Sequence, residues 1–209
     1  MLNYDDHDLN RLKSFLNQLT ADIYPEPETN GHNTLILHAI DLLLKSGYLL
    51  PGMKLLDVGC GQGYALELFA KIGLIPVGVT IGAEDLQICN NKGLNVYCMD
   101  QSFLKFKDHV FDFIWCRHCI EHSIFPYFTL AGFTRILKPE GKVYIEVPAP
   151  DTACNHQTNK NHYSVLGKSM WIELIERSGF NLIKSLDLKM GSQTGLDVYY
   201  AFIGYKKKS

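Results

Sequence analysis

The stretch "LLDVGCGQGYALELF", residues 55–69, decides the fold of this chain. Its apolar beginning is typical of a short buried strand, and the apolar spacing over residues 64–73 is that of a helix. Three glycines, Gly59, Gly61 and Gly63, stand between the two. Because glycine loses more backbone entropy on folding than any other residue, this turn must require positive φ angles or a close approach to its backbone.

Strand and helix patterns alternate along the chain after this turn. Such alternation predicts βαβ units in a mainly parallel sheet. No helix pattern separates the last two predicted strands, so we expect them to pair antiparallel at an edge. Two further helices are predicted before the first strand, over residues 8–23 and 33–46. The predicted strands cover 54–59, 74–80, 94–99, 110–116, 142–148, 181–188 and 197–205, and the helices between them cover 64–73, 83–93, 128–141 and 168–180.

Composition limits the classes of protein to which the chain can belong. Its 209 residues are 46% hydrophobic and 20% charged, which indicates a single domain, with or without a small cap. A net charge of −2 gives no indication of binding to nucleic acid or to a membrane surface. The sequence contains no run of eighteen apolar residues, so we predict no membrane span. Six cysteines without framework spacing favour a reducing compartment, so we expect a cytoplasmic protein.

The glycine turn also indicates a bound ligand. In a parallel sheet, ligands bind beyond the carboxyl ends of the strands, where glycine turns and helix N-termini approach them. The fingerprint of dinucleotide-binding domains has its third glycine at the sixth position. Counted from Gly59, that position is Tyr64, which argues against NAD as the ligand.

At this point the sequence resembles the class I S-adenosylmethionine-dependent methyltransferases, from about residue 53 to residue 205. "LLDVGCGQG" is similar to their first motif, and three later motifs follow in order: "VYCMD" at 96–100, "FDFIWCRHCIEH" at 111–122 and "RILKPEGKVYIEVP" at 135–148. The resemblance implies a Rossmann-like α/β fold with helices on both faces of a seven-stranded sheet. It also implies the strand order 3-2-1-4-5-7-6, with only the seventh strand antiparallel.

The resemblance also implies the cofactor, S-adenosylmethionine, with S-adenosylhomocysteine as the product, and the residues that bind it. Asp57, Gly59 and Gly61 would line the methionine and ribose end. Asp100 would accept a hydrogen bond from the adenine amine, and Phe103 is a candidate to cover one face of the ring. The full predicted set is Asp57, Gly59, Cys60, Gly61, Gly63, Thr80, Ile81, Asp100, Gln101, Ser102 and Cys116.

The end of the second strand departs from the family pattern. Most members have an acidic residue there that binds both ribose hydroxyls, whereas this chain has Thr80 or Ile81. Its "GVTI" string resembles the cyclopropane fatty acid synthases and their relatives. Thr80 can donate and accept hydrogen bonds but cannot make the charged bidentate contact. Either backbone amides and Thr80 hold the ribose, or Glu84 reaches back from the start of the next helix.

The candidate catalytic groups lie in "CRHCIEHS", residues 116–123, after the predicted fourth strand. Methyl transfer requires alignment of the acceptor, exclusion of water and often removal of a proton. His118 and His122 are candidate bases, because histidine titrates near neutral pH. Arg117 is a candidate clamp for an anionic acceptor. The alternatives are a packing role for each histidine and an ordinary salt bridge for Arg117.

Two further segments are candidates for contacts with the acceptor. The polar stretch 148–167 has no periodicity and follows the fifth strand, so it is either a lid with contacts to the acceptor or a surface loop. The N-terminal helices are either a cap with Tyr4, His7, Tyr24 and His32 as contacts or a structural cover.

Metal binding is a weaker alternative. The chain has several histidines and cysteines that could supply a tetrahedral set, but no complete ligand spacing. We therefore expect no metal. The side chains concerned are Cys116, His118, Cys119, His122, Cys154, His156 and His162.

The sequence thus predicts an N-terminal helical cap over 1–50 and a methyltransferase domain over 51–209. The expected activity is transfer of a methyl group from S-adenosylmethionine to an oxygen or nitrogen atom of a small molecule. One alternative is methylation of carbon or of a lipid-like acceptor, which the strings "GVTIGAEDL" and "SIFPYF" suggest and a pocket of Phe125, Tyr127 and Phe128 would support. Another is a protein that binds the cofactor, or a partner, without catalysis.

Overall fold

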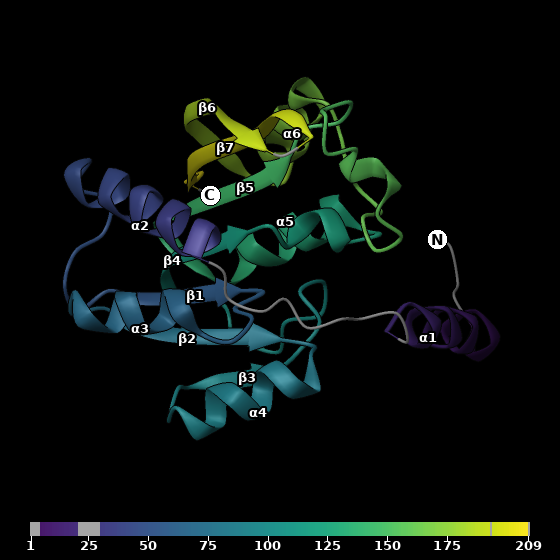
Figure 1. The fold of residues 1–209 in the computed structure, drawn as a ribbon. Helices are drawn as coiled ribbons and strands as arrows, with labels where there is room; N and C mark the ends of the chain where they lie inside the picture. The colour runs from purple at the N-terminus through teal and green to yellow at the C-terminus, as the bar shows by residue number, and fades with distance from the viewer. Residues whose placement is uncertain (1–4, 21–29, 193, 209) are drawn as a thin grey trace.

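A computed structural model describes residues 5–20, 30–192 and 194–208. Seven strands form one sheet in the order β3-β2-β1-β4-β5-β7-β6 (Figure 1). The first five pair in parallel, and β7 pairs antiparallel with both β5 and β6, which confirms the predicted order. The strands are β1 (Lys54–Val58), β2 (Ile75–Thr80), β3 (Val96–Cys98), β4 (Phe111–Arg117), β5 (Leu137–Pro148), β6 (Phe180–Ser192) and β7 (Gly195–Lys206).

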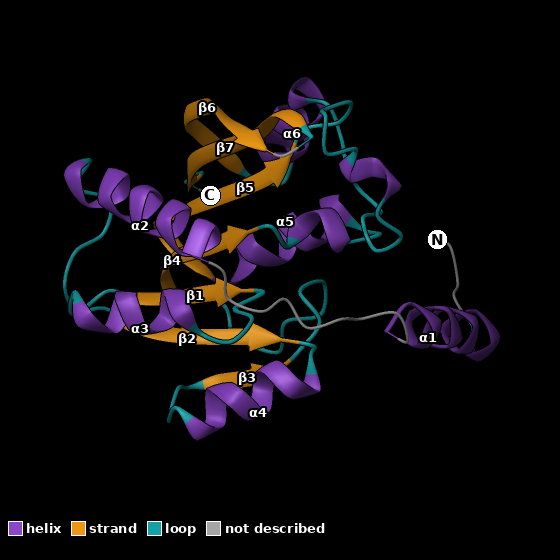
Figure 2. Cartoon of the chain, in the orientation of Figure 1, coloured by secondary structure: helices purple, strands orange, loops and turns teal. Residues whose placement is uncertain are grey.

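Helices cover both faces of this sheet (Figure 2). Each predicted helix is present, with ends that differ by a few residues, and two short 3-10 helices add to them. The helices are α1 (Asp6–Thr20), α2 (Asn30–Lys45), α3 (Tyr64–Lys71), α4 (Ala83–Asn91), α5 (Pro126–Ile136) and α6 (Lys168–Arg177), with η1 (Ile120–His122) and η2 (His156–Thr158).

Alternation along the strands divides the core into two layers. On β1 and β4, Leu55 and Phe113 face the apolar cluster that includes α2 and α3. Their neighbours Leu56 and Ile114 face the larger cluster that includes α5 and α6. Successive side chains of a strand point to opposite faces, so strands buried on both faces are apolar almost throughout. That is the pattern of "KLLDV" and "FDFIWC".

The two N-terminal helices differ in their relation to the sheet. Leu43 of α2 is fully buried in the same cluster as Leu55 of β1 and Phe69 of α3, so α2 is part of the layer that covers the sheet. The predicted boundary between the N-terminal cap and the methyltransferase domain, at residue 50, therefore lies within one packed cluster. Helix α1 lies apart from the sheet, beyond the arrowheads of β1 and β2 (Figure 1).

One element boundary differs for a clear reason. The predicted helix over 128–141 ends at Ile136, and β5 begins at Leu137, which pairs with Phe111. Pro139 has no backbone N–H and disfavours helical geometry in the residue before it. The helix therefore stops before the proline. No helix in the described part of the chain is long and apolar enough to cross a membrane.

The glycine turn has the backbone that the sequence predicts. Gly59, Gly61 and Gly63 have φ angles of 77°, 48° and 88°. A Cβ at Gly59 would lie 2.5 Å from the Sγ and 2.7 Å from the Cβ of Cys119, and one at Gly63 would lie 2.3 Å from Leu94. Gly59 therefore permits close contact between the loops that follow β1 and β4.

We predict that Gly59→Ala destabilises the protein by roughly 2–4 kcal/mol. The alanine would have to adopt a left-handed backbone conformation, and its Cβ would clash with the Cβ of Cys119. Gly47→Ala is the matched control, because Gly47 has a φ of 69° but nothing within 4 Å of an added Cβ. Urea denaturation of both variants measures the difference. Equal losses would show that the contact between the two loops does not constrain Gly59.

Candidate functional site

A pocket opens at the carboxyl ends of β1, β2 and β4. It brings together the glycine turn, the ends of β2 and β3, the turn after β4, part of the 148–167 loop and one side of α1. Of the predicted cofactor residues, seven line it, as do His118 and His122. The lining residues are Leu16, Leu19, Gly59, Gly61, Val79, Thr80, Ile81, Gly82, Asp85, Met99, Asp100, Gln101, Ser102, His118, Cys119, His122, Ser123, Ile124, Asn161 and Tyr163.

The glycine turn forms one wall of this pocket. The backbone N–H groups of Gly59 and Cys60 both donate to the carbonyl of Val79, at 2.9 and 3.0 Å, and fix the turn to β2. A Cβ built at Gly61 meets no atom within 4 Å, although Gly61 lines the pocket. The space beside Gly61 is therefore open to a ligand, which can lie directly against the backbone.

Asp57 is the penultimate residue of β1, just before the turn; its carboxyl group is buried, and it does not line the pocket. The residue is 2% exposed, and within the described chain its Oδ2 has no hydrogen-bond partner. Burial and the nearby Cys89 raise the pKa of Asp57 to about 8, although Arg117 opposes the shift. A buried carboxylate without compensation is costly, so this group favours a cation in its neighbourhood.

Asp100, Gln101 and Ser102 also line the pocket. The Oδ1 of Asp100 accepts the backbone N–H of Ser102 at 2.7 Å, and the Nε2 of Gln101 donates to the Cys119 carbonyl at 2.9 Å. The Ser102 hydroxyl is within 2.8 Å of that of Thr129. These bonds hold the three residues in place beside the turn that follows β4.

At the end of β2, Thr80 and Ile81 both line the pocket. The Thr80 hydroxyl accepts the backbone N–H of Gly82 at 3.2 Å, which shapes the turn into α4. Glu84 is exposed and does not line the pocket, so the structure favours Thr80 over Glu84 for this contact. The acidic residue in the pocket is Asp85, one position further, which is 7% exposed.

Three predicted cofactor residues serve packing instead. Cys116 is fully buried in the core between the sheet and α5. Cys60 packs with Leu66 and Cys89, and the lack of a side chain at Gly63 makes room for that same cluster. None of the three lines the pocket. The motif correctly located the turn, but only Gly59 and Gly61 of its glycines line the pocket.

His118 is part of a buried network that the sequence did not reveal. Its Nε2 lies 2.8 Å from the Oε1 of Glu146, whose other oxygen accepts the hydroxyl of Tyr144. Burial alone would raise the pKa of Glu146, but His118, Arg117 and Tyr144 together lower it to about 2. The carboxylate is therefore ionised and can only accept hydrogen bonds, so the His118 nitrogen that faces it carries the proton.

Arg117 has a different role from the one predicted. Its side chain is 7% exposed, and its Nε lies 2.8 Å from the Oε1 of Glu146. It does not line the pocket, so it does not clamp an acceptor. Side chains of adjacent strand residues point to opposite faces, but His118 has a φ of 50°. This left-handed residue lets both side chains reach Glu146, while His118 also reaches the pocket.

The 148–167 loop is fastened to the pocket wall at η1. Tyr163 and Ser164 donate their backbone N–H groups to the Glu121 carbonyl, both at 2.9 Å. His122 lines the pocket, and its Nδ1 lies 2.9 Å from the Asn161 carbonyl. Because that bond assigns the proton to Nδ1, the imidazole of His122 is held in one orientation. His118 is not part of the short helix that holds His122.

The remaining predicted contacts are distributed as follows. Phe103, Phe125, Tyr127 and Phe128 do not line the pocket. His7 is exposed on α1, which instead contributes Leu16 and Leu19 to the pocket. Tyr4, Tyr24 and the side chain of His32 lie outside the described residues.

Comparisons with known proteins agree with this architecture. A family model described as a methyltransferase domain matches residues 31–188. The ubiquinone biosynthesis O-methyltransferase of Methylococcus capsulatus is 33% identical over 120 residues, which cover 52% of this chain and 50% of that protein. The chain spans about half the length of the curated relatives it matches.

Solved structures show the same fold. An S-adenosylmethionine-dependent methyltransferase from Archaeoglobus fulgidus superposes with a TM-score of 0.65 at 22% identity, over 81% of this chain and 93% of the other. The [4+2]-cyclase SpnF superposes with a TM-score of 0.70 at 17% identity, over 100% and 98%. At these identities the likeness shows the fold alone. On the match of the family model to most of its length, the chain belongs to the methyltransferase-domain family.

Proposed function

We propose that this protein binds S-adenosylmethionine in the pocket and transfers its methyl group to an oxygen or nitrogen atom of a small molecule. Oxygen is the favoured acceptor atom, because the curated relatives are named O-methyltransferases. The observation that carries the proposal is the pocket itself. It brings together the open space beside the Gly61 backbone, the carboxylate oxygens of Asp100 and the imidazole of His118.

The buried carboxyl group of Asp57 fits this cofactor. S-adenosylmethionine supplies a methyl group activated on a sulfonium and also carries an ammonium at its amino-acid end. The unpartnered Oδ2 of Asp57 would be stabilised by such a cation. Asp100, which lines the pocket, would accept a hydrogen bond from the adenine amine. The protein thus offers the carboxylate of Asp100 in the pocket and the buried carboxyl group of Asp57 two residues before Gly59.

His118 is the group that we assign to remove the acceptor's proton. Its Nε2 donates to Glu146, so Nδ1 is the nitrogen that takes a proton in a neutral imidazole. The ionised Glu146 would stabilise the imidazolium that results, and Arg117 and Tyr144 hold Glu146 in place. In this account, Glu146 positions His118, and His118 is the catalytic residue.

Two alternatives receive less support. A lipid-like acceptor would favour a pocket of Phe125, Tyr127 and Phe128, but these residues lie outside the pocket. Binding without catalysis is compatible with the fold, because a fold does not determine its activity. The same fold occurs in SpnF, which is named as a cyclase and not as a methyltransferase. The pairing of His118 with a buried carboxylate favours a catalytic role over that alternative.

We predict that Gly61→Val abolishes binding of S-adenosylhomocysteine while the protein stays folded, because the branched side chain would occupy ligand space. The matched control is Gly93→Val, since Gly93 has a φ of 71° and open space but lies outside the pocket. Calorimetry and thermal denaturation of both variants separate binding from stability. Wild-type affinity in Gly61→Val would contradict the placement of the cofactor.

A second prediction uses the pKa of Asp57, about 8 in the free protein against 3.8 ordinarily. Between these values the folded state holds a proton that the unfolded chain releases, so this group lowers the free energy of unfolding as pH rises. A cationic ligand favours the ionised carboxyl. Affinity for S-adenosylhomocysteine should therefore increase by roughly one to two orders of magnitude between about pH 6 and pH 8.

Calorimetry in buffers of different ionisation enthalpy would detect the proton that Asp57 releases on binding. Asp57→Asn is the control, because it keeps the shape but cannot titrate. Its affinity should be lower and nearly independent of pH over the same range. An equal pH dependence in Asp57→Asn would assign the proton to another group.

For catalysis, we predict that His118→Ala lowers kcat by about a hundredfold to ten-thousandfold on a panel of phenols, catechols and amines. Affinity for S-adenosylhomocysteine should hardly change, because His118 acts on the acceptor. His38→Ala on the exposed side of α2 is the control. A lower melting temperature with normal kcat in His118→Ala would show that its bond to Glu146 is structural only.

A further inference from the structure

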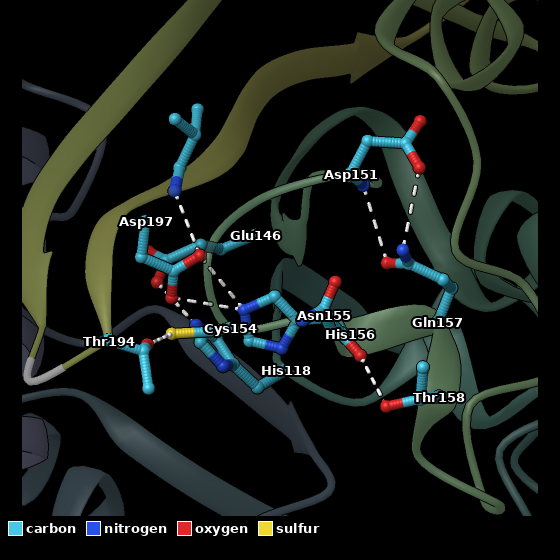
Figure 3. Close-up of polar contacts among 11 residues, drawn as sticks. His118, Glu146, Asp151, Cys154, Asn155, His156, Gln157, Thr158, Thr194 and Asp197 are labelled. Carbon is cyan, nitrogen blue, oxygen red and sulfur yellow. Dashed lines mark hydrogen bonds and ion pairs between the residues drawn. The ribbon is translucent and has the colours of Figure 1, made fainter.

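A second group of reactive side chains lies in the 148–167 loop, outside the proposed catalytic pair. Cys154 and His156 of the loop and Asp197 of β7 place a thiol, an imidazole and a carboxylate together. Their ligand atoms all lie within 4.8 Å of one another. Figure 3 shows the His156 ring directed at the Asp197 carboxylate, with the Cys154 sulfur beside them. We call these three residues the Cys154 cluster.

The backbone brings the cluster together from distant parts of the chain. Cys154 and His156 flank Asn155, which has a left-handed φ of 49° and begins η2. Asp197 lies 41 positions beyond His156, and both of its carboxylate oxygens are 3.0 Å from the Nε2 of His156. The Asp197 Oδ1 also accepts the backbone N–H of Val198 at 2.9 Å. That bond fixes the orientation of the carboxylate.

Burial is graded across the cluster. The Asp197 side chain is 4% exposed and the His156 side chain is 16% exposed, while Cys154 is partly exposed. A carboxylate held in the interior is costly unless it is paired with positive charge. The partly exposed thiol and imidazole leave a path by which an ion from solvent could reach it.

The ligand types and spacing suit one metal in particular. Zinc is bound by Cys sulfur at about 2.3 Å and by His nitrogen or carboxylate oxygen at about 2.0–2.2 Å, usually in a tetrahedron. Tetrahedral bonds of those lengths place ligand atoms about 3.3–3.8 Å apart. The Nε2 of His156 and the Oδ1 of Asp197 are 3.0 Å apart, so they need to separate only slightly for an ion to enter.

We propose that Cys154, His156 and Asp197 bind one Zn²⁺ ion and leave its fourth position to water. Binding requires the Cys154 thiol to lose its proton to solvent. It also requires His156 to carry its proton on Nδ1, so that Nε2 can bind the ion. The sequence analysis led us to expect no metal. Residue spacing alone gave no reason to join Asp197 to the two loop residues.

The site would fasten the loop close to the catalytic pair. The His156 ring lies 5.3 Å from that of Tyr199, and Tyr199 stacks on His118 at 4.4 Å. Further along the same loop, Asn161 and Tyr163 line the pocket. An ion that ties the loop to β7 would therefore fix the acceptor side of the pocket.

Two other groups in the described chain have ligand atoms this close, and they serve as comparisons. Glu121, His122 and His162 form one beside the pocket, and Asp5, His7 and Asp8 form the other at the exposed start of α1. Neither contains a thiol, and thiolate ligands select zinc over the hard cations Mg²⁺ and Ca²⁺. A spectroscopic signal from a metal–thiolate bond therefore distinguishes the Cys154 cluster from both.

The test is titration of the metal-free full-length protein with Co²⁺, followed by displacement with Zn²⁺. We expect one equivalent to bind, with a thiolate-to-cobalt charge-transfer band and tetrahedral d–d bands that Zn²⁺ removes. Cys154→Ser should abolish the charge-transfer band. It should also weaken Zn²⁺ binding by at least the roughly 10–100-fold that loss of an outer-shell partner costs.

Controls separate this site from other thiols and other clusters. Cys98→Ser removes an exposed thiol on β3, and His162→Asn disrupts the neighbouring group; both should keep the band. Zn²⁺ should raise the melting temperature of the wild type and of both controls but not of Cys154→Ser. No band in the wild type, a band retained in Cys154→Ser, or binding lost only in His162→Asn would each overturn the proposal.

Discussion

The close approach of the loops after β1 and β4 is the constraint on which the site depends. Gly59 meets Cys119 at a distance that no side chain would permit, and its backbone N–H is fixed to Val79 of β2. Three strand ends are thereby held together at one edge of the sheet. The remaining walls of the pocket, from Asp100 and from the 148–167 loop, build on this edge.

Buried charge is the second organising feature of the molecule. Asp57, two residues before Gly59, has a carboxyl oxygen without a hydrogen-bond partner in the described chain, whereas Glu146 is surrounded by His118, Arg117 and Tyr144. The two carboxyl groups accordingly have opposite shifts in pKa, to about 8 and about 2. The carboxyl group of Asp57, which lacks a partner, suits a cationic cofactor. The ion-paired Glu146 suits an imidazole that accepts a proton.

Most of the fold could be predicted from the sequence, because strand and helix patterns are strong and the motif resemblance supplied the strand order. The site was predicted only in part. Asp85 was missed by one position, since the register of a turn decides which acid faces the pocket. Glu146 and Asp197 were missed for another reason: both lie in apolar strand patterns, and only the pairing of β4, β5 and β7 shows what they contact. Arg117 was assigned to the acceptor because sequence position alone did not show its burial.

A crystal structure of the protein with S-adenosylhomocysteine would test this arrangement of the site most directly. We expect the amino-acid end of the ligand to lie against Gly59 and Gly61, the adenine to lie beside Asp100, and the sulfur to be directed toward His118. Adenine at the glycine turn, or a ligand bound away from this edge of the sheet, would contradict it.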